Sequence, residues 1–335
     1  MLSASRRSWL GAAAVIGIAA VAVAYPVLVE NPFYRYLGVL TVMYMALAMG
    51  WNIMGGSTGY VSLGHTAFFG LGAYLTGLAV VRLGLPPFPM AIVAGLAVTF
   101  FAVGVGYAAL RTRGASFVIV TLALVYILGL VAQGWRDLTG GSIGLSLPTI
   151  EGFGAGDIHV PFYYAFLLLL AVVTGTSWWI GRSKFGMGLR AIREDEDKAE
   201  SLGVDTMRYK VIAFALSAGF VGIGGGLYAY WFRHLDPIFV FDIVIGVNMI
   251  LMALIGGMRT LFGPILGALL IAPGSELIAA RLGETQIHLF ATGLLLAVVV
   301  LLMPEGIIPS LRDLVARLRP PSASIREQRA GENSR

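Results

Sequence analysis

The sequence predicts an all-α polytopic membrane protein with about ten transmembrane helices. Of its 335 residues, 58% are hydrophobic and only 12% are charged, and the mean hydropathy is +0.84. Soluble domains carry about 25% charged residues, so water cannot be the main solvent of this chain. The 44 Gly and 14 Pro agree with this class, because transmembrane helices tolerate both residues. The lack of Cys excludes disulfides, thiolate metal sites and Cys nucleophiles.

Apolar runs of about 17–25 residues are needed to cross the hydrocarbon core of a bilayer. The ten predicted spans are residues 8–29, 36–54, 60–82, 88–110, 115–133, 161–181, 209–232, 241–257, 261–280 and 286–303. The stretch from Gly256 to Pro264 between the eighth and ninth also fits one span followed by a re-entrant segment. Arg6 and Arg7 before the first run imitate a secretory or twin-arginine signal, but we expect a retained helix because nine further spans follow.

Basic residues predict the orientation of the spans. With ten spans both termini lie on one side, and only five of the 23 Lys and Arg residues then fall on the other side. These five are Arg35, Arg82, Arg136, Arg233 and Arg281. The positive-inside rule therefore places both termini in the cytoplasm. We divide the chain into a cytoplasmic N-terminus (1–7), a transmembrane domain (8–303) with an inner loop at 182–208, and a polar cytoplasmic tail (304–335).

Residues 186–203 form a strongly charged segment of the inner loop. Ile192, Ala199 and Leu202 are spaced at i, i+7 and i+10, so a helix would carry them on one face, and Gly203 is placed to end that helix. A run of charges is ordinarily a solvated loop, but a small apolar face flanked by glycines is typical of a helix that docks into a partner protein. We therefore predict a short amphipathic helix that is exposed to the cytoplasm and binds a partner.

The run from Gly188 to Glu196, Gly-Leu-Arg-Ala-Ile-Arg-Glu-Asp-Glu, resembles the coupling segment of the permeases of ABC importers for branched-chain amino acids. Ala199, Gly203 and Lys210 also fit that family's pattern, in the subunit that is paired with a second, related permease. The resemblance implies a type II ABC importer-like permease in the bacterial cytoplasmic (inner) membrane, with this segment seated in a cytoplasmic ATPase subunit. The predicted ATPase-coupling residues are Gly188, Arg190, Ala191, Ile192, Arg193, Glu194, Ala199, Leu202 and Gly203.

Two further runs resemble the same family. Residues 52–68, Asn-Ile-Met-Gly-Gly-Ser-Thr-Gly-Tyr-Val-Ser-Leu-Gly-His-Thr-Ala-Phe, match its N-x3-G-x2-G-x2-S-x-G-x3-F signature, although Tyr60 stands where Gln is frequent. Residues 256–267 match its GGxGTxxGPxxG turn, with Arg259 in place of the usual glycine. If that glycine needs a positive φ, the turn must differ here. The three matches together span roughly residues 50–270.

The stretch from Gly55 to Gly64 is predicted to break a membrane helix and to offer a polar path to a zwitterion. The predicted pathway residues are Asn52, Gly56, Ser57, Gly59, Ser62, Gly64, His65, Phe68, Asn248, Gly256 and Gly257. Close helix packing through glycine is an equally good interpretation. For His65 and Asn248 the alternative is a hydrogen bond to a neighbouring helix. Small residues at four-residue spacing predict a helix-packing face on the seventh span.

The chain contains no Gly-x4-Gly-Lys-Ser/Thr loop for ATP phosphates and no metalloprotease or hydrolase motif. We therefore expect no enzyme activity, catalytic residue, metal or cofactor, and an energy source in another subunit. The resemblance implies as partners a second related permease, two cytoplasmic ATPase subunits, a periplasmic or extracellular solute-binding protein and membrane lipid, but no nucleic acid. It implies Leu, Ile and Val as substrates, while permeases for urea or short amides look similar in all three motifs. An ATP-independent channel or secondary transporter and a membrane enzyme are the alternatives of other classes.

Overall fold

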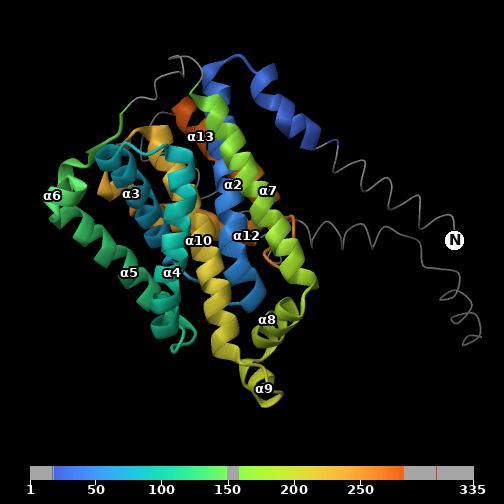
Figure 1. Cartoon of the computed structure of the whole chain (residues 1–335). Helices are drawn as coiled ribbons and strands as arrows, with labels where there is room; N and C mark the ends of the chain where they lie inside the picture. Colours follow the sequence, from blue (N-terminus) through green and yellow to red (C-terminus); the bar gives the residue numbers. More distant parts are fainter. Residues whose placement is uncertain (1–16, 18, 149–157, 283–306, 308–335) are drawn as a thin grey trace, which may run out of the picture.

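The computed structural model describes residue 17, residues 19–148, residues 158–282 and residue 307 (Figure 1). In these parts of the chain, eight helices are long and apolar enough to cross a membrane, and they coincide with the predicted spans two to nine. The apolar helix Ala19–Leu28 represents the first predicted span. The tenth predicted span, residues 1–7 and the tail apart from residue 307 lie outside the described residues. The predicted class, an all-α polytopic membrane protein, is confirmed.

The long helices account for most of the described chain. They are α2 (Pro32–Thr58), α3 (His65–Leu83), α4 (Pro87–Ala109), α5 (Ala115–Gly134), α7 (His159–Arg182), α10 (Thr206–Phe232), α12 (Ile243–Gly256) and α13 (Gly263–Leu282). The short elements are α6 (Arg136–Thr139), η1 (Gly141–Ile143), β1 (Leu145–Ser146), α8 (Lys184–Glu194), α9 (Glu196–Ser201), β2 (His234–Leu235) and α11 (Pro237–Val240). The eighth predicted span therefore consists of α11 and α12 together, and the turn between α12 and α13 joins two separate helices.

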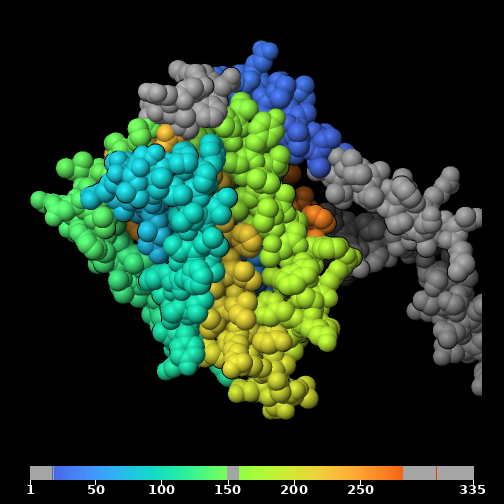
Figure 2. All heavy atoms as spheres, in the orientation of Figure 1, coloured from blue at the N-terminus to red at the C-terminus, as the bar shows by residue number. Residues whose placement is uncertain are grey.

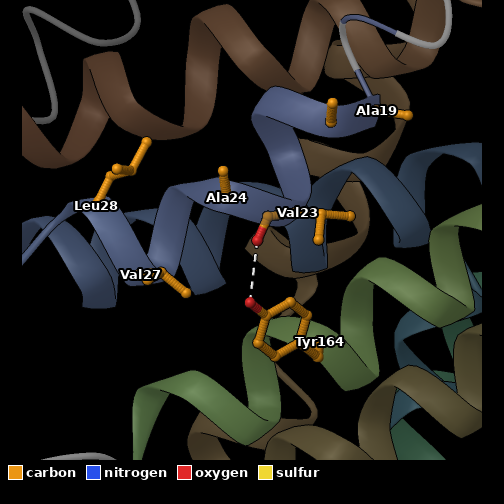
Figure 3. A pocket seen from close by; sticks show the side chains of 7 residues that line it. Ala19, Val23, Ala24, Val27, Leu28 and Tyr164 are labelled. Carbon is orange, nitrogen blue, oxygen red and sulfur yellow. Dashed lines mark hydrogen bonds between the residues drawn. The ribbon is translucent and has the colours of Figure 1, made fainter.

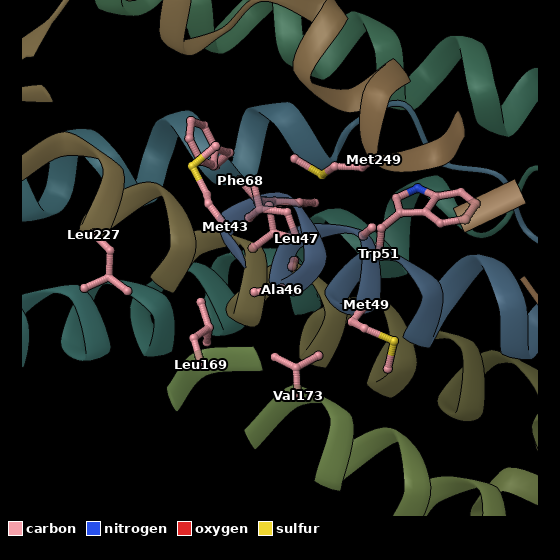
Figure 4. Close-up of a cluster of buried hydrophobic side chains, with 14 of the residues drawn as sticks. Met43, Ala46, Leu47, Met49, Trp51, Phe68, Leu169, Val173, Leu227 and Met249 are labelled. Atoms are coloured by element: carbon pink, nitrogen blue, oxygen red, sulfur yellow. The ribbon is translucent and has the colours of Figure 1, made fainter. Parts of the chain in front are cut away.

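Helix α2 lies at the centre of the bundle (Figure 1). In its most apolar stretch 94% of the residues are buried, and it packs against α7, α10, α12 and α13. Leu47, Met49 and Trp51 belong to the buried cluster that Figure 4 shows, and none of them is exposed. A helix that is apolar on all sides must be surrounded by other helices or by lipid. For α2 the surrounding groups are protein side chains.

Helix α2 also continues through part of the predicted break. It remains helical to Thr58, and the amide of Gly59 donates to the carbonyl of Gly55 at 3.0 Å. Gly59 then ends the helix in the left-handed conformation, with a φ of 77°. The indole of Trp51 covers Gly55, where an added Cβ would overlap the ring. The break is thus confined to residues 59–64, because this packing holds a helical backbone that glycine by itself disfavours.

Helix α10 packs on α3 and α4 through glycines. A Cβ added at Gly225 would overlap the carbonyl of Phe69, and one added at Gly72 would overlap the backbone of Gly222. Inside a bilayer, where lipid is as apolar as leucine, such close backbone contact is a main source of attraction between helices. The helix-packing face predicted for the seventh span is confirmed.

The two ends of the bundle are built differently. At one end β1 and β2 pair antiparallel, and Arg82 donates a hydrogen bond to the carbonyl of Asp137 in α6. At the other end α8 and α9 extend beyond the long helices, at the bottom of the view in Figure 1. We call this second end the α8–α9 end.

The outer surface of the bundle is apolar. Phe100 on α4 is 78% exposed and Leu130 on α5 is 66% exposed, and these helices form much of the face shown in Figure 2. Helix Ala19–Leu28 lies beside α7, where the hydroxyl of Tyr164 donates to the carbonyl of Val23 at 3.0 Å (Figure 3). Large exposed apolar side chains on several faces are what a lipid solvent requires.

The contact at Gly225 gives a test of the packing. Gly225→Ala places a methyl group against the Phe69 carbonyl, so α3 and α10 must move apart, and we expect the free energy of unfolding to fall by about 1–3 kcal/mol. Gly104→Ala is the matched control, because nothing lies within 4 Å of a Cβ added there. Thermal unfolding of both variants in one detergent measures the difference. Equal melting temperatures would show that the close contact does not stabilise the bundle.

Candidate functional site

The charged segment forms two helices, α8 and α9, instead of the single helix predicted for residues 186–203. Asp195 between them is extended, with a φ of −163°, and its carboxylate accepts a hydrogen bond from the amide of Lys198 at 3.1 Å. Gly203 follows α9 with a φ of 88°. The prediction of one continuous helix is wrong because Asp195 caps the start of a second one.

The three apolar residues predicted to share one exposed face do not do so. Ile192 and Ala199 are 3% and 2% exposed and are buried within this chain, whereas Leu202 is 84% exposed. Only an unbroken helix would place these three residues on one face, and the helix is interrupted at Asp195. Leu202 is therefore the one of these three side chains that a partner protein can reach.

A buried polar cluster lies beneath α9, with Glu196 at its centre. The carboxylate of Glu196 is 2.6 Å from Nζ of Lys210, and the two side chains are 11% and 3% exposed. The hydroxyl of Tyr60 donates to the other carboxylate oxygen. Nζ of Lys210 also donates to the carbonyl of Leu110 at 3.3 Å and lies 4.9 Å from the centre of the Tyr60 ring. We call these residues the Glu196 cluster; it joins α9 to α10, to the break after α2 and to the end of α4.

Two arginines extend these contacts. Arg113, between α4 and α5, lies 3.4 Å from Glu196 and 2.7 Å from Asp197. Arg193 on α8 donates through Nη1 to the carbonyl of Gly56 in α2 at 3.0 Å. The α8–α9 segment is thus fastened to the central helix as well as to α10, and a displacement of the segment acts on both.

Burial and hydrogen bonding decide the ionisation of the Glu196 cluster. Burial raises the pKa of Glu196, but hydrogen bonds from Lys210 and Tyr60 and the charges of Lys210 and Arg113 outweigh this effect, so the pKa of the carboxyl lies below its usual 4.5. Burial and the neighbouring Glu196 raise the pKa of Tyr60, which stays protonated and donates. Because folding lowers the pKa of Glu196, its contribution to stability is present above about pH 4.5 and is lost as the pH falls through the folded value.

A cavity of about 290 Å³ lies beside α8. Three predicted pathway residues, Asn52, Gly56 and Ser57, line it together with two predicted coupling residues, Arg190 and Arg193. The structure therefore brings these two predicted groups together. We call this space the arginine cavity, after the four arginines in its lining, which are Arg182, Arg190, Arg193 and Arg259.

The other pathway residues near the break are packed against protein. Ser62, His65 and Phe68 are completely buried. Nε2 of His65 is 2.6 Å from the hydroxyl of Ser217, which in turn donates to the carbonyl of Gly50 at 2.7 Å. Since the Ser217 proton is used in that bond, Nε2 of His65 carries the proton that Ser217 accepts. The predicted alternative for His65, a hydrogen bond to a neighbouring helix, is what the structure has.

The remaining predicted pathway residues are Gly64, Gly256, Gly257 and Asn248. A Cβ added at Gly64 would lie 3.0 Å from Thr121, and one added at Gly256 would overlap the backbone of Gly263. Gly257 ends α12 with a φ of 109°. The side chain of Asn248 lies near Tyr44 on α2, and a hydrogen bond from Asn248 to a neighbouring helix stays a prediction.

The rest of the predicted coupling residues lie on α8 or at its end. Tyr209 covers Gly188, Arg190 donates to the carbonyl of Gly181 at 2.8 Å, and Glu194 pairs with Arg193 at 3.3 Å. Ala191 is partly exposed. Arg259 is not strained, because Arg233 is the only non-glycine residue with a positive φ in the described ranges.

No functional role was predicted for Lys210, Tyr60 or Arg113. The sequence could have indicated that Lys210 is paired within the protein, because a lysine at the start of an apolar span needs a partner. Tyr60 appeared only as a departure from a motif. Its contact with Glu196 joins residues 136 positions apart, which no local pattern reveals. Among the described residues, no group of three or more His, Cys, Asp or Glu side chains could hold a metal ion.

The known proteins that this chain resembles are permease components of branched-chain amino acid transport systems. Residues 34–303 match the family model described as "Branched-chain amino acid transport system / permease component". The chain is 28% identical over 323 residues to the high-affinity branched-chain amino acid transport system permease protein LivM of Escherichia coli K12, which covers 89% of this chain and 75% of LivM. It is 24% identical over 283 residues to LivH of Salmonella typhimurium, covering 79% of this chain and 91% of LivH. No solved structure matches.

Removal of one charge from the Glu196 cluster tests how it holds the segment. Lys210→Met removes the nearest partner of the Glu196 carboxylate, which keeps Arg113 and Tyr60, so we expect the free energy of unfolding to fall by about 1–3 kcal/mol. Asp197→Asn is the control, because Asp197 and Arg113 form an exposed pair worth about 0–1 kcal/mol. Thermal unfolding at pH 7 provides the measurement.

The double variant Lys210→Met with Glu196→Gln separates charge from packing. It should recover much of the lost stability, because the carboxyl group that lost its nearest partner is no longer charged. A Lys210→Met variant no less stable than Asp197→Asn would contradict a stabilising role for the pair.

Proposed function

The chain belongs to the family of branched-chain amino acid transport permease components, and from this premise we propose that it is the transmembrane permease subunit of an ATP-driven ABC importer. We propose Leu, Ile and Val as its substrates and the bacterial cytoplasmic (inner) membrane as its location. The relatives support this assignment, because LivM and LivH are described as permease proteins of branched-chain amino acid transport systems. The chain itself contributes helices that span the membrane and no loop that would hold ATP phosphates.

The α8–α9 end faces the cytoplasm in this proposal. Lys and Arg are concentrated there, as the positive-inside rule requires. A second related permease completes the membrane part, two ATPase subunits bind at the α8–α9 end, and a solute-binding protein delivers substrate at the end that carries β1 and β2. Both termini and the tail 304–335 are assigned to the cytoplasmic side on the same grounds.

The observation that carries the proposal is the attachment of α8 and α9 to the membrane helices. A buried ion pair holds α9 to Lys210 at the start of α10, and Arg193 holds α8 to Gly56 near the end of α2. Because α2 is the most buried helix and α10 packs closely on α3 and α4, motion of the segment cannot be absorbed locally. An ATPase that moves α8 and α9 would therefore move the core of the bundle.

The short break at residues 59–64 is the proposed site of gating. Tyr60 within it contacts Glu196, and Arg193 lies against Gly59, where an added Cβ would be 3.1 Å from Cγ of the arginine. The segment therefore touches the break directly. Ser62, Gly64, His65 and Phe68 are packed here, so a path along them requires the break to open. Gly256, Gly257 and Asn248, on the neighbouring α12, complete the proposed path.

Reconstitution tests the function and its alternatives. Proteoliposomes with this chain, its partner permease, the ATPases and the binding protein should take up labelled Leu only when ATP is hydrolysed. Uptake of urea or a short amide in place of Leu would assign the chain to that related importer class. Solute uptake by this chain alone, without ATPase or ATP, would refute the permease assignment in favour of a secondary transporter or channel.

The exposed Leu202 gives a test of ATPase docking. Leu202→Glu puts a charge on the apolar side chain that a partner would cover, and loss of that burial should weaken co-purification with the ATPase about 10-fold or more. Ile143→Glu is the control, because Ile143 is 85% exposed at the opposite end. Ile192→Glu is unsuitable, since Ile192 is buried within the chain. Undiminished ATPase binding and uptake in Leu202→Glu would exclude Leu202 from the docking surface.

A further inference from the structure

Among the described residues, the arginine cavity carries positive charge that only the exposed Glu194 balances. In the part of the chain that the structure describes, its lining contains Arg182, Arg190, Arg193 and Arg259 and no Asp or Glu. Like charges in one cavity repel each other unless an anion balances them. An amino acid is a zwitterion, and the described lining offers its ammonium group only neutral acceptors such as Asn52 and Ser57, with no carboxylate. The lining therefore suits an anion better than the proposed transport substrate.

The arginines are held in place and still have donors to offer. Arg190 uses Nη1 for the carbonyl of Gly181, and Arg182 lies 4.1 Å from the centre of the Trp178 ring. Arg193 binds Gly56 and the exposed Glu194, while its buried Nε has no hydrogen-bond partner among the described residues. A guanidinium has five N–H donors in a fixed plane and binds phosphate through pairs of them. Each of these three side chains retains unused donors.

The cavity lies near one end of the membrane-spanning helices. Its walls come from the last two turns of α2 and α7, from α8, and from the turn between α12 and α13. Trp178 and Trp179 on α7 are 49% and 61% exposed beside it. Exposed tryptophans near span ends mark the interface between lipid and water.

We propose that the arginine cavity binds the phosphate group of an anionic membrane phospholipid such as phosphatidylglycerol. The volume of about 290 Å³ equals roughly ten water molecules and admits a phosphate with a small headgroup. Basic pockets between membrane helices are suited to anionic headgroups. Bound lipid would bridge α7, α8 and the turn after α12. This site includes the predicted pathway residues Asn52, Gly56 and Ser57 in its lining, whereas Leu202 lies outside it.

Lipid binding to the purified full-length chain tests the proposal. Nanodiscs or mixed micelles containing phosphatidylglycerol should raise the melting temperature and retain lipid in native mass spectra, whereas phosphatidylcholine should do neither. The double variant Arg182→Gln, Arg259→Gln should bind phosphatidylglycerol about 10–30-fold more weakly, since each basic residue contributes about a five-fold factor. Neither residue belongs to the Glu196 cluster.

The matched control is Arg111→Gln, Arg208→Gln, which removes the same charge at the α8–α9 end from residues outside the cavity lining. Equal weakening in both double variants, or equal retention of phosphatidylcholine, would overturn the proposal. Inorganic phosphate that stabilises the lipid-free chain as well as phosphatidylglycerol does would replace the lipid with free phosphate. If the double variant does not fold, Arg259→Gln alone, in an exposed turn, should still weaken retention several-fold, and unchanged retention there would overturn the proposal.

Discussion

The buried ion pair between Glu196 and Lys210 is the interaction on which the α8–α9 end depends. Withdrawing two charges from water costs several kcal/mol for each, and this cost is offset only because further groups complete the site. Tyr60 donates to the carboxylate, and the ammonium donates to the carbonyl of Leu110. Because the partners come from four separate segments, the pair forms only when α9, α10, the break and the end of α4 are all in place. Its geometry thus fixes their relative positions.

The glycine contacts pack helix α10, which holds α9 through Lys210, tightly against its neighbour α3. Gly72 and Gly225 bring the backbones of α3 and α10 together so closely that neither helix can tilt without the other. Helix α2 is surrounded by protein, and Arg193 donates a hydrogen bond to the carbonyl of Gly56 near its end. Packed interiors transmit a displacement instead of absorbing it. The helices that meet the charged segment are therefore also closely packed members of the described bundle.

Charge is distributed unevenly at this end of the molecule. Glu196 and Asp197 on α9 pair with Lys210 and Arg113, whereas the described lining of the arginine cavity has no carboxylate. The paired charges hold α9 to α10 and to Arg113, and the arginines of the cavity are free to bind the lipid phosphate that we propose. A lipid phosphate would neutralise the second group without disturbing the first, because different side chains serve each.

The sequence alone determined the membrane class, eight of the spans within a few residues, and the family, because hydropathy and short motifs are local properties. It also indicated that the glycines of the seventh span pack against helices. Tertiary structure decided that Gly55 stays helical, that Asp195 divides the charged segment, and that Ile192 is buried while Leu202 is exposed. It alone joined Glu196 to Tyr60, since a partner 136 positions away depends on how distant segments fold together and leaves no periodic trace in the chain.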